Sequence, residues 1–384
     1  MMIEKLNIYD TFSCTADRCP LTCCQEWKIA VDEDTYEQWR KVPADCNCLG
    51  KKVEDKKLAD YVTYKDETRV IVLNEEKQCP FLNEKKLCRL VLTHGDSMLS
   101  ETCQIFPRQN STYDGRKVYA LMAGCPAVVD ILKEQDSIEV IQVEGEEDED
   151  ILFKVRDVLM QLIKREDISA EEALQLGFIM MLNLIEDDSE EAMESVLADF
   201  TCEETLQEMI QEIREMDFQK VYTFEECNEL FLDLAENYRK EGIYAEYLVP
   251  AAELAEEYEE APEYEVEEDV EEFLKQYKVY DKLMRNYLVT EVFANLYLPE
   301  ASLETVTMAL QWIAMEYAAV RHGIFLQWVL SRQDEISYDI VRDAIVIVSR
   351  MTGYDEEDIQ EYLENSFETP VWEWGYLALI TGRI

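Results

Sequence analysis

The sequence predicts a mainly α-helical fold, in which a small cysteine-rich α+β module precedes an all-helical acidic module. Ten of the 12 cysteines lie in the first 125 residues. Residues 1–130 carry 18 basic and 21 acidic side chains, whereas residues 131–384 carry 18 basic and 63 acidic ones. Through much of the second part, apolar residues recur at helical spacing. We therefore place a cysteine-rich metal-cluster module at residues 1–135, an acidic linker at 136–150 and the helical module at 151–384.

Five segments of the first module have recognisable local patterns. Residues 27–31 alternate like a short strand, and 69–73 are β-branched enough for another. Residues 34–42 and 88–92 are expected to be short helices. A helix is also expected over 126–133, because proline is well suited to a first helical position. The module has few long elements and a limited core, so metal ligation would help to fix it.

Helix starts and stops organise the second module. The acidic run at 144–150 has no apolar periodicity, which indicates a solvated linker or loop. Ser169 and Glu172 have the spacing of a capping box, and Thr223 and Glu226 repeat it. Gly242 is a plausible helix stop.

Longer helical patterns follow in the remainder of the chain. Residues 256–272 are rich in Glu, Tyr and Val and contain Pro262, so we expect a connection between helices there. The helical patterns cover residues 270–297, 303–330, 334–350 and 355–367.

Charge and composition exclude several classes of protein. The net charge is −48, so a nucleic-acid binder is excluded because phosphates would be repelled. No apolar run approaches the roughly 18 residues of a membrane span, and the N-terminus lacks a signal-peptide pattern. We therefore expect a cytoplasmic protein with no membrane partner. In a reducing compartment, clustered cysteines are more often metal ligands or catalytic thiols than disulfides.

The cysteines have the chemistry of soft-metal ligands. Thiolates suit zinc and iron–sulfur iron, and four are needed for each site, so the module has enough for two. Their spacing matches neither a zinc ribbon nor a bacterial ferredoxin, and it leaves the metal open. Buried packing and disulfides remain the alternatives. Cys202 and Cys227 lie on helical patterns and are interpreted as structural. The interpretation of Cys46 and Cys48 is intermediate between structural packing and metal ligation.

The two histidines add little. His94 and His322 are too few for a multi-histidine metal site or a histidine-based triad. His94 lies between Cys88 and Cys103 in the sequence, so a ligand or proton-transfer role is open, with an ordinary loop histidine as the default.

A wider pattern is more specific than the spacing alone. It runs as Phe12-Ser13-Cys14-x4-Cys19-x3-Cys23-Cys24-x2-Trp27-x-Ile29, Cys79-Pro80-Phe81-Leu82, Leu87-Cys88, Gly95-x3-Leu99-Ser100-x-Thr102-Cys103-x2-Phe106-Pro107-Arg108 and Gly124-Cys125-Pro126. It resumes at residues 280–289 and continues through Phe293 to Pro299. The sequence thus resembles the flagellin lysine-N-methylase family and the wider group of zinc- or iron-chelating cysteine-cluster proteins.

The resemblance implies N-methylation of flagellin lysines with S-adenosylmethionine as methyl donor and a [4Fe–4S] cluster in the protein, with zinc as the alternative metal. Flagellin is then the protein partner. The cysteines that match the family pattern are Cys14, Cys19, Cys23, Cys24, Cys79, Cys88, Cys103 and Cys125. We rank Cys14 and Cys125 as the second set and the other six as the primary set, and we expect Cys23, Cys24, Cys79, Cys88 and Cys103 to lie together.

Two positions depart from the family pattern. Ala127 stands where the family usually has Glu, and residues 351–354 replace an acidic and histidine-containing stretch after Ser349 and Arg350. If the missing groups act in the site, activity or substrate is altered here.

Alternative interpretations remain open for the cofactor site and for the function. Arg108 is a candidate to hold the carboxylate of a bound methionine moiety or to pair with cluster charge, against a structural salt bridge. No glycine-rich fingerprint is present, so the S-adenosylmethionine site is not expected to be a conventional Rossmann site. Catalytic residues stay unassigned. The alternative function is a non-catalytic zinc or iron–sulfur protein with a structural, electron-transfer or flagellin-binding role, and a third is an acidic chaperone for flagellin export.

Overall fold

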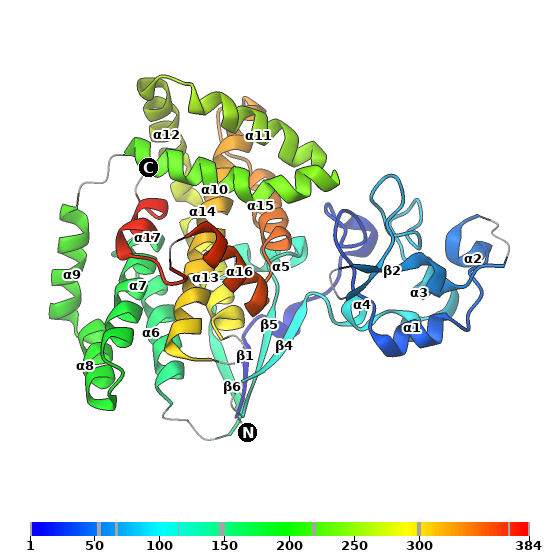
Figure 1. Cartoon of the computed structure of the whole chain (residues 1–384), viewed down its shortest axis with the longest axis horizontal. Coiled ribbons are helices and arrows are strands. Elements are labelled where there is room, and N and C mark those ends of the chain that lie inside the picture. Colours follow the sequence, from blue (N-terminus) through cyan, green and yellow to red (C-terminus); the bar gives the residue numbers. More distant parts are fainter. Residues whose placement is uncertain are drawn as a thin grey trace.

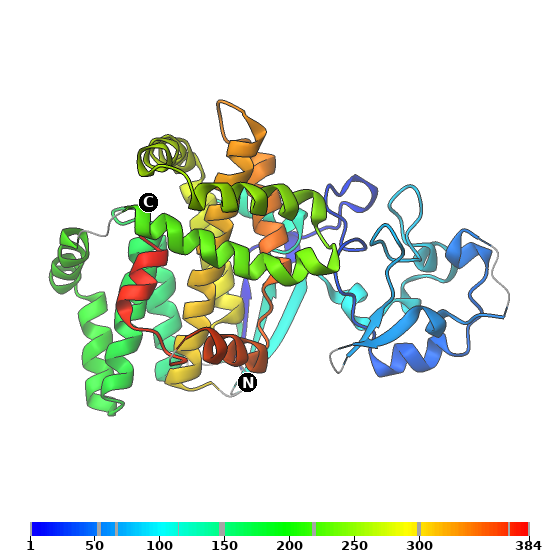
Figure 2. The same cartoon turned by 45° about the horizontal axis from the view of Figure 1, so that its top comes forward.

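A computed structural model of the chain describes residues 2–51, 55–65, 68–113, 115–145, 150–216, 220–297, 301–367 and 369–382. Helices dominate, which confirms the mainly α-helical prediction. Figures 1 and 2 show a large helical body, with a smaller lobe containing α1 to α4 projecting from one side of it. None of the described helices combines the length and apolar character that a membrane crossing requires.

A four-stranded sheet lies within the helical body. Its strands are β1 (Met2–Leu6), β4 (Arg108–Tyr113), β5 (Arg116–Leu121) and β6 (Val140–Glu144), in the order β4-β5-β1-β6. β1 runs parallel to β5, with Ile3 opposite Lys117, and the other two pairs are antiparallel. Helices α5 (Pro126–Glu134) and α13 (Asp281–Asn295) pack together, and α13 also lies against β5.

The sheet changes the predicted division of the chain. We expected residues 136–150 to be a linker. Instead, β6 forms within them and pairs with β1, with Lys5 opposite Ile141. Residues 146–149 of the acidic run lie outside the described part. Buried residues of β1 and β5, such as Leu6 and Val118, share one hydrophobic core with the helices. The second module is therefore not purely helical in its packing, because it is built on strands from the first 121 residues.

The helical body is assembled around one long central helix. α14 (Leu303–Ser331) is buried over most of its length and packs against α7, α10, α11, α13 and α15. The other helices are α6 (Ile151–Lys164), α7 (Ala170–Glu186), α8 (Glu190–Thr201), α9 (Glu203–Glu215), α10 (Lys220–Glu241), α11 (Ala245–Glu259), α12 (Glu263–Tyr277), α15 (Tyr338–Met351), α16 (Glu356–Ser366) and α17 (Trp374–Ile380).

The predicted helix signals had mixed outcomes. The capping box of Ser169 and Glu172 opens α7, with both hydrogen bonds present, which confirms that prediction. The box predicted at Thr223 is wrong, because α10 already begins at Lys220 and Thr223 is fully buried inside it. Gly242 follows the last residue of α10 with φ +63°, which confirms the predicted stop.

The expected connection over residues 256–272 is also wrong. α11 continues to Glu259, and α12 begins at Glu263 directly after Pro262. Val266, Val270 and Phe273 are all buried at helical spacing, so tertiary packing outweighs the high local charge. The helix predicted over 270–297 is divided by a 3₁₀ turn at Lys278–Tyr280.

The smaller lobe has a hydrophobic core of its own. It contains α1 (Glu33–Trp39), α2 (Cys46–Leu49), α3 (Arg89–His94), α4 (Glu101–Ile105) and the hairpin β2 (Val62–Lys65) and β3 (Thr68–Ile71). Trp39 is the centre of this core, and its indole Nε1 donates to the Met98 carbonyl at 2.9 Å. The strand predicted over residues 27–31 is wrong: Ala30 forms only an isolated bridge with Val70.

Candidate functional site

Seven of the eight predicted cysteine ligands gather where the lobe meets the helical body. Cys19, Cys23 and Cys24 lie on the loop that enters the lobe, and the backbone N–H of Cys79 donates to the Cys24 carbonyl at 2.8 Å. The others lie at helix starts: Cys88 caps α3, Cys103 lies in α4 and Cys125 caps α5. The ionisation of each of the seven is influenced by at least one other thiol of the group.

Burial and mutual repulsion control the charge of these thiols. Burial, together with the charge of nearby cysteines, raises the pKa of Cys103 to about 11 and that of Cys125 to about 12. Burial also raises the pKa of Cys79 strongly. Cys23 differs, because the hydrogen bond from Cys24 lowers the pKa of Cys23 to about 7. Cys23 is thus the thiol of this group that ionises most readily. The raised pKa values of the other thiols disfavour their ionisation unless a bound cation stabilises the thiolates.

Arg350 brings positive charge to this group of thiols. Its guanidinium donates to the carbonyls of Gly124 at 2.7 Å and Leu21 at 2.9 Å, and to the Tyr244 hydroxyl at 3.3 Å. The side chain is buried and lies over the Trp27 ring. It lowers the pKa of Cys23. Its charge acts on the thiols of Cys19 and Cys23 and on the Glu26 carboxylate.

Other predicted residues lie elsewhere. Cys14 is exposed and accepts a hydrogen bond from its own loop. Arg108 starts β4, donates weakly to the Phe12 carbonyl at 3.5 Å and lies over the Tyr9 and Phe12 rings, so its contacts here are structural. Cys48 contacts His94 at 3.4 Å.

The two cysteines interpreted as structural differ from each other. Cys227 is fully buried, and its thiol donates to the Ile380 carbonyl at 3.3 Å, as that interpretation requires. Cys202 is exposed, at the start of α9.

The donor set fits a thiolate-bound metal in its chemistry. It consists of sulfur ligands, and it accumulates negative charge on ionisation with one nearby guanidinium to offset it. Among the described residues, no three Cys, His, Asp or Glu side chains converge closely enough to form a finished metal site. Which thiols share a metal therefore stays a prediction.

A second polar cluster lies across α15 from the thiols. Glu316 is fully buried in α14 and accepts hydrogen bonds from the hydroxyls of Tyr287, Thr352 and Ser349. Glu291 of α13 is 4% exposed and accepts from Asn295 Nδ2 at 2.6 Å.

The pKa values of Glu291 and Glu316 are both raised, so the pair carries less negative charge at a given pH than two exposed carboxyl groups would. Burial and the charge of Glu316 raise the pKa of Glu291 well above its usual range. Burial raises the pKa of Glu316 too, although its three hydroxyl donors oppose the rise. Burial therefore disfavours the negative charge of both carboxyl groups.

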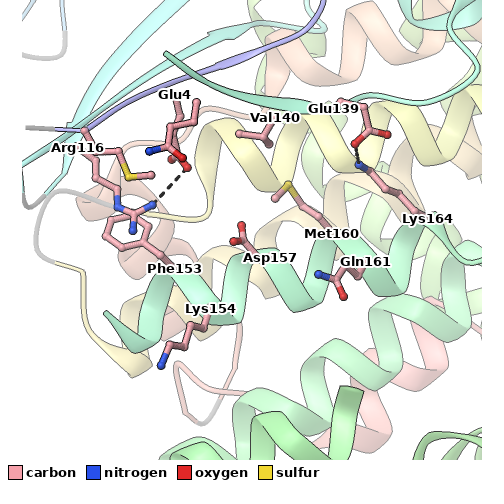
Figure 3. A pocket seen from close by; sticks show the side chains of 12 residues that line it. Glu4, Arg116, Glu139, Val140, Phe153, Lys154, Asp157, Met160, Gln161 and Lys164 are labelled. Atoms are coloured by element: carbon pink, nitrogen blue, oxygen red, sulfur yellow. Dashed lines mark hydrogen bonds and ion pairs between the residues drawn. The ribbon is translucent and has the colours of Figure 1, made fainter. Parts of the chain in front are cut away.

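A cavity of about 600 Å³ opens between the edge of the sheet and α6 (Figure 3). Glu4 accepts from Arg156 at 2.9 and 3.0 Å and from Arg116 at 3.3 Å, and Glu139 pairs with Lys164 at 2.8 Å. Glu4 and Glu139 thus already have cationic partners, so neither carboxylate is left unmatched to attract a cation.

Comparison with known proteins identifies the helical body. Residues 156–380 match the FliB lysine N-methylase C-terminal domain. The chain belongs to the FliB lysine N-methylase family. The matched region includes Glu291, Glu316 and Arg350, and it begins after the last of the clustered cysteines. Family membership confirms the resemblance found in the sequence.

Individual relatives agree with this assignment. The flagellar biosynthetic protein FliU of Salmonella muenchen is 30% identical over 136 residues, which are 33% of this chain and 75% of that protein. The lysine-N-methylases of Salmonella choleraesuis and Salmonella typhimurium are 29% and 30% identical over 33% of this chain. The match spans 31% of the length of each of these two proteins. No solved structure matches the chain.

Sequence reasoning missed the buried carboxyl pair. Glu316 lies in a helix that is apolar on all sides, and Glu291 lies in a helix that is buried throughout. The sequence signal that could have revealed this pair is an acidic residue inside a long apolar helical pattern. The departure at residues 351–354 was noticed, and it falls where Thr352 contacts Glu316.

Proposed function

We propose that this protein is an S-adenosylmethionine-dependent protein lysine N-methyltransferase that acts on flagellin, with a [4Fe–4S] cluster, or zinc, held by thiols of the smaller lobe. The observation that carries the proposal is the family match over the helical body. Two relatives are named lysine-N-methylases, and a third is named a flagellar biosynthetic protein.

Methyl transfer makes a defined demand on the protein. The lysine nitrogen must lose a proton, and its lone pair then attacks the methyl carbon while the carbon–sulfur bond of the sulfonium breaks. An ammonium and a sulfonium repel each other, so negative potential beside the site lowers the free energy of bringing them together. The acidic body and its buried carboxyl pair supply that potential.

The smaller lobe would hold the metal. Cys23, Cys24, Cys79, Cys88 and Cys103 are the thiols that belong to the lobe, and Cys19 and Cys125 lie at its border with the body. A bound cluster would supply positive charge that allows several thiols to ionise together. Arg350 connects the same thiols to α15 of the helical body.

The test is a methylation assay on anaerobically purified protein. The protein is incubated with methyl-labelled S-adenosylmethionine and flagellin from the same organism, and flagellin lysines are examined by mass spectrometry. We expect added methyl groups and a broad absorbance near 400 nm from an iron–sulfur cluster. The Cys202→Ser variant is the matched control, since it removes an exposed thiol outside the group.

Two results would overturn the proposal. Folded, metal-loaded protein that binds flagellin but leaves its mass unchanged would favour the non-catalytic alternative. Colourless active protein with stoichiometric zinc would overturn the iron–sulfur part alone.

A further inference from the structure

A second cavity, of about 370 Å³, lies between β4 and the end of α13. Three tyrosine rings line it, those of Tyr113, Tyr297 and Tyr354, together with the amide side chains of Gln109 and Asn295. The rings of Tyr113 and Tyr297 meet edge to face at 5.6 Å between centroids. Its volume is within the range of small-ligand sites, and its wall combines three aromatic rings with polar side chains.

The buried carboxyl pair lies directly behind this wall. Asn295 lines the cavity and donates to Glu291, so a single amide separates Glu291 from the open space. Tyr354 lines the cavity as well, and the charges of Glu316 and Glu291 raise the pKa of its hydroxyl. That hydroxyl is buried beside Glu316 and Glu291, and its interactions with them act to lower the pKa of both carboxyl groups.

The charges around the cavity are unbalanced. Within the described part of the chain, neither Glu291 nor Glu316 forms an ion pair. Arg156 lies 5.9 Å from the Tyr297 ring centre and is already paired with Glu4, as is Arg116, which lies opposite Tyr113 on β5. A buried negative charge without a counter-ion is unfavourable, and a bound cation would relieve it.

We propose that this cavity binds the side-chain ammonium of the acceptor lysine, either unmodified or partly methylated. The inference deepens the proposed function and rests on it. Aromatic rings attract alkylammonium groups through cation–π contacts, and they tolerate added methyl groups better than a carboxylate contact does. The Tyr354 ring lines the cavity, its hydroxyl connects that wall to the carboxyl pair, and the pair supplies the opposite charge.

The cavity of Figure 3 is a weaker candidate for the same ligand. Its carboxylates are matched by Arg116, Arg156 and Lys164, so an ammonium there would meet cations as well as anions. A metal ion is also a poor occupant of the tyrosine-lined cavity, since no three ligating side chains converge there among the described residues.

The experiment measures binding of short peptides by calorimetry, without the methyl donor. The probes are one peptide with a central lysine, the same peptide with trimethyl-lysine, and the same peptide with norleucine, which has the chain but no charge. We expect both charged peptides to bind at least tenfold more tightly than the norleucine peptide. The double variant Glu291→Gln, Glu316→Gln should lose that preference.

Two further variants keep the test decisive. Tyr354→Phe retains the ring and removes the hydroxyl that connects the cavity wall to the carboxyl pair, so it should weaken the binding of both charged peptides relative to that of the norleucine peptide. Glu139→Gln neutralises a carboxylate at the cavity of Figure 3 and should bind as the wild type does. Circular dichroism confirms that each variant is folded.

The outcomes separate this inference from the proposed function. Equal binding of the lysine and norleucine peptides, or unchanged binding in folded Tyr354→Phe and double variants, would overturn the inference even if flagellin is methylated. Charge-selective binding that depends on Tyr354 and the carboxyl pair would support it even if no methyl transfer occurs, in which case the proposed function fails alone.

Discussion

The buried carboxyl pair predicts an unusual dependence of stability on pH. The folded-state pKa of Glu291 is raised by burial and by the charge of Glu316. A raised pKa means that its contribution to stability is complete below the unfolded pKa of about 4.3 and is lost as the pH rises through the folded value. Over that interval the folded state holds one more proton than the unfolded state at this position.

The Glu291→Gln variant removes this proton linkage. Glutamine resembles the protonated acid, so it keeps an acceptor for Asn295 without the pH dependence. One proton corresponds to about 1.4 kcal/mol per pH unit. Between pH 5.5 and 7.5 the unfolding free energy of the variant should therefore rise, relative to the wild type, by up to about 2.7 kcal/mol.

Urea denaturation followed by circular dichroism at 222 nm measures this difference, because the helical body dominates that signal. Glu171→Gln is the matched control. Burial raises the pKa of Glu171, but Arg321 and the Tyr317 hydroxyl outweigh it, so the net pKa is lowered. Its contribution is then complete above about pH 4.3, and its difference from wild type should stay constant from pH 5.5 to 7.5. A constant difference for Glu291→Gln as well would refute the reasoning.

Three other expectations concern the thiols, the lobe contact and the acidic surface. A Cys23→Ser, Cys79→Ser double variant should lose its metal by elemental analysis, whereas Cys202→Ser should not; full metal content in the double variant would contradict the ligand assignment. Arg350→Met leaves two backbone carbonyls without their donor and should lower the unfolding free energy by about 2 to 4 kcal/mol in urea titrations, so an unchanged midpoint would count against its role. Flagellin association, measured by surface plasmon resonance, should slow sharply between about 50 and 300 mM salt if residues 131–384 recruit the partner, and a rate insensitive to salt would remove that role.

Local chemistry explains the elements that the sequence predicted well. Ser169 with Glu172, Pro126 and Gly242 act within one turn of backbone, so their effect can be recognised without the fold. The capping box predicted at Thr223 does not form because α10 begins earlier, at Lys220, and Thr223 lies inside this helix. Its hydroxyl is instead buried inside that helix.

Site residues could be predicted from the sequence only where their chemistry is unusual. Clustered thiols stand out in a sequence, and seven of the eight predicted ligands do come into electrostatic contact. Arg108 and Cys14 show the limit of that reasoning, because sequence proximity to a ligand does not establish which way a side chain points. The carboxyl pair depends on two helices meeting, and no local pattern encodes the partner of a buried acid.

The last turn of α15 contains two consecutive residues whose side chains contact different polar groups. Ser349 donates to Glu316, while Arg350, its neighbour in the chain, holds the loop before Cys23 and the turn before Cys125. A rigid helical turn cannot adjust one of these contacts without displacing the other. If ionisation of a thiol and occupation of the tyrosine-lined cavity both shift this turn, each changes the free energy of the other by the same amount.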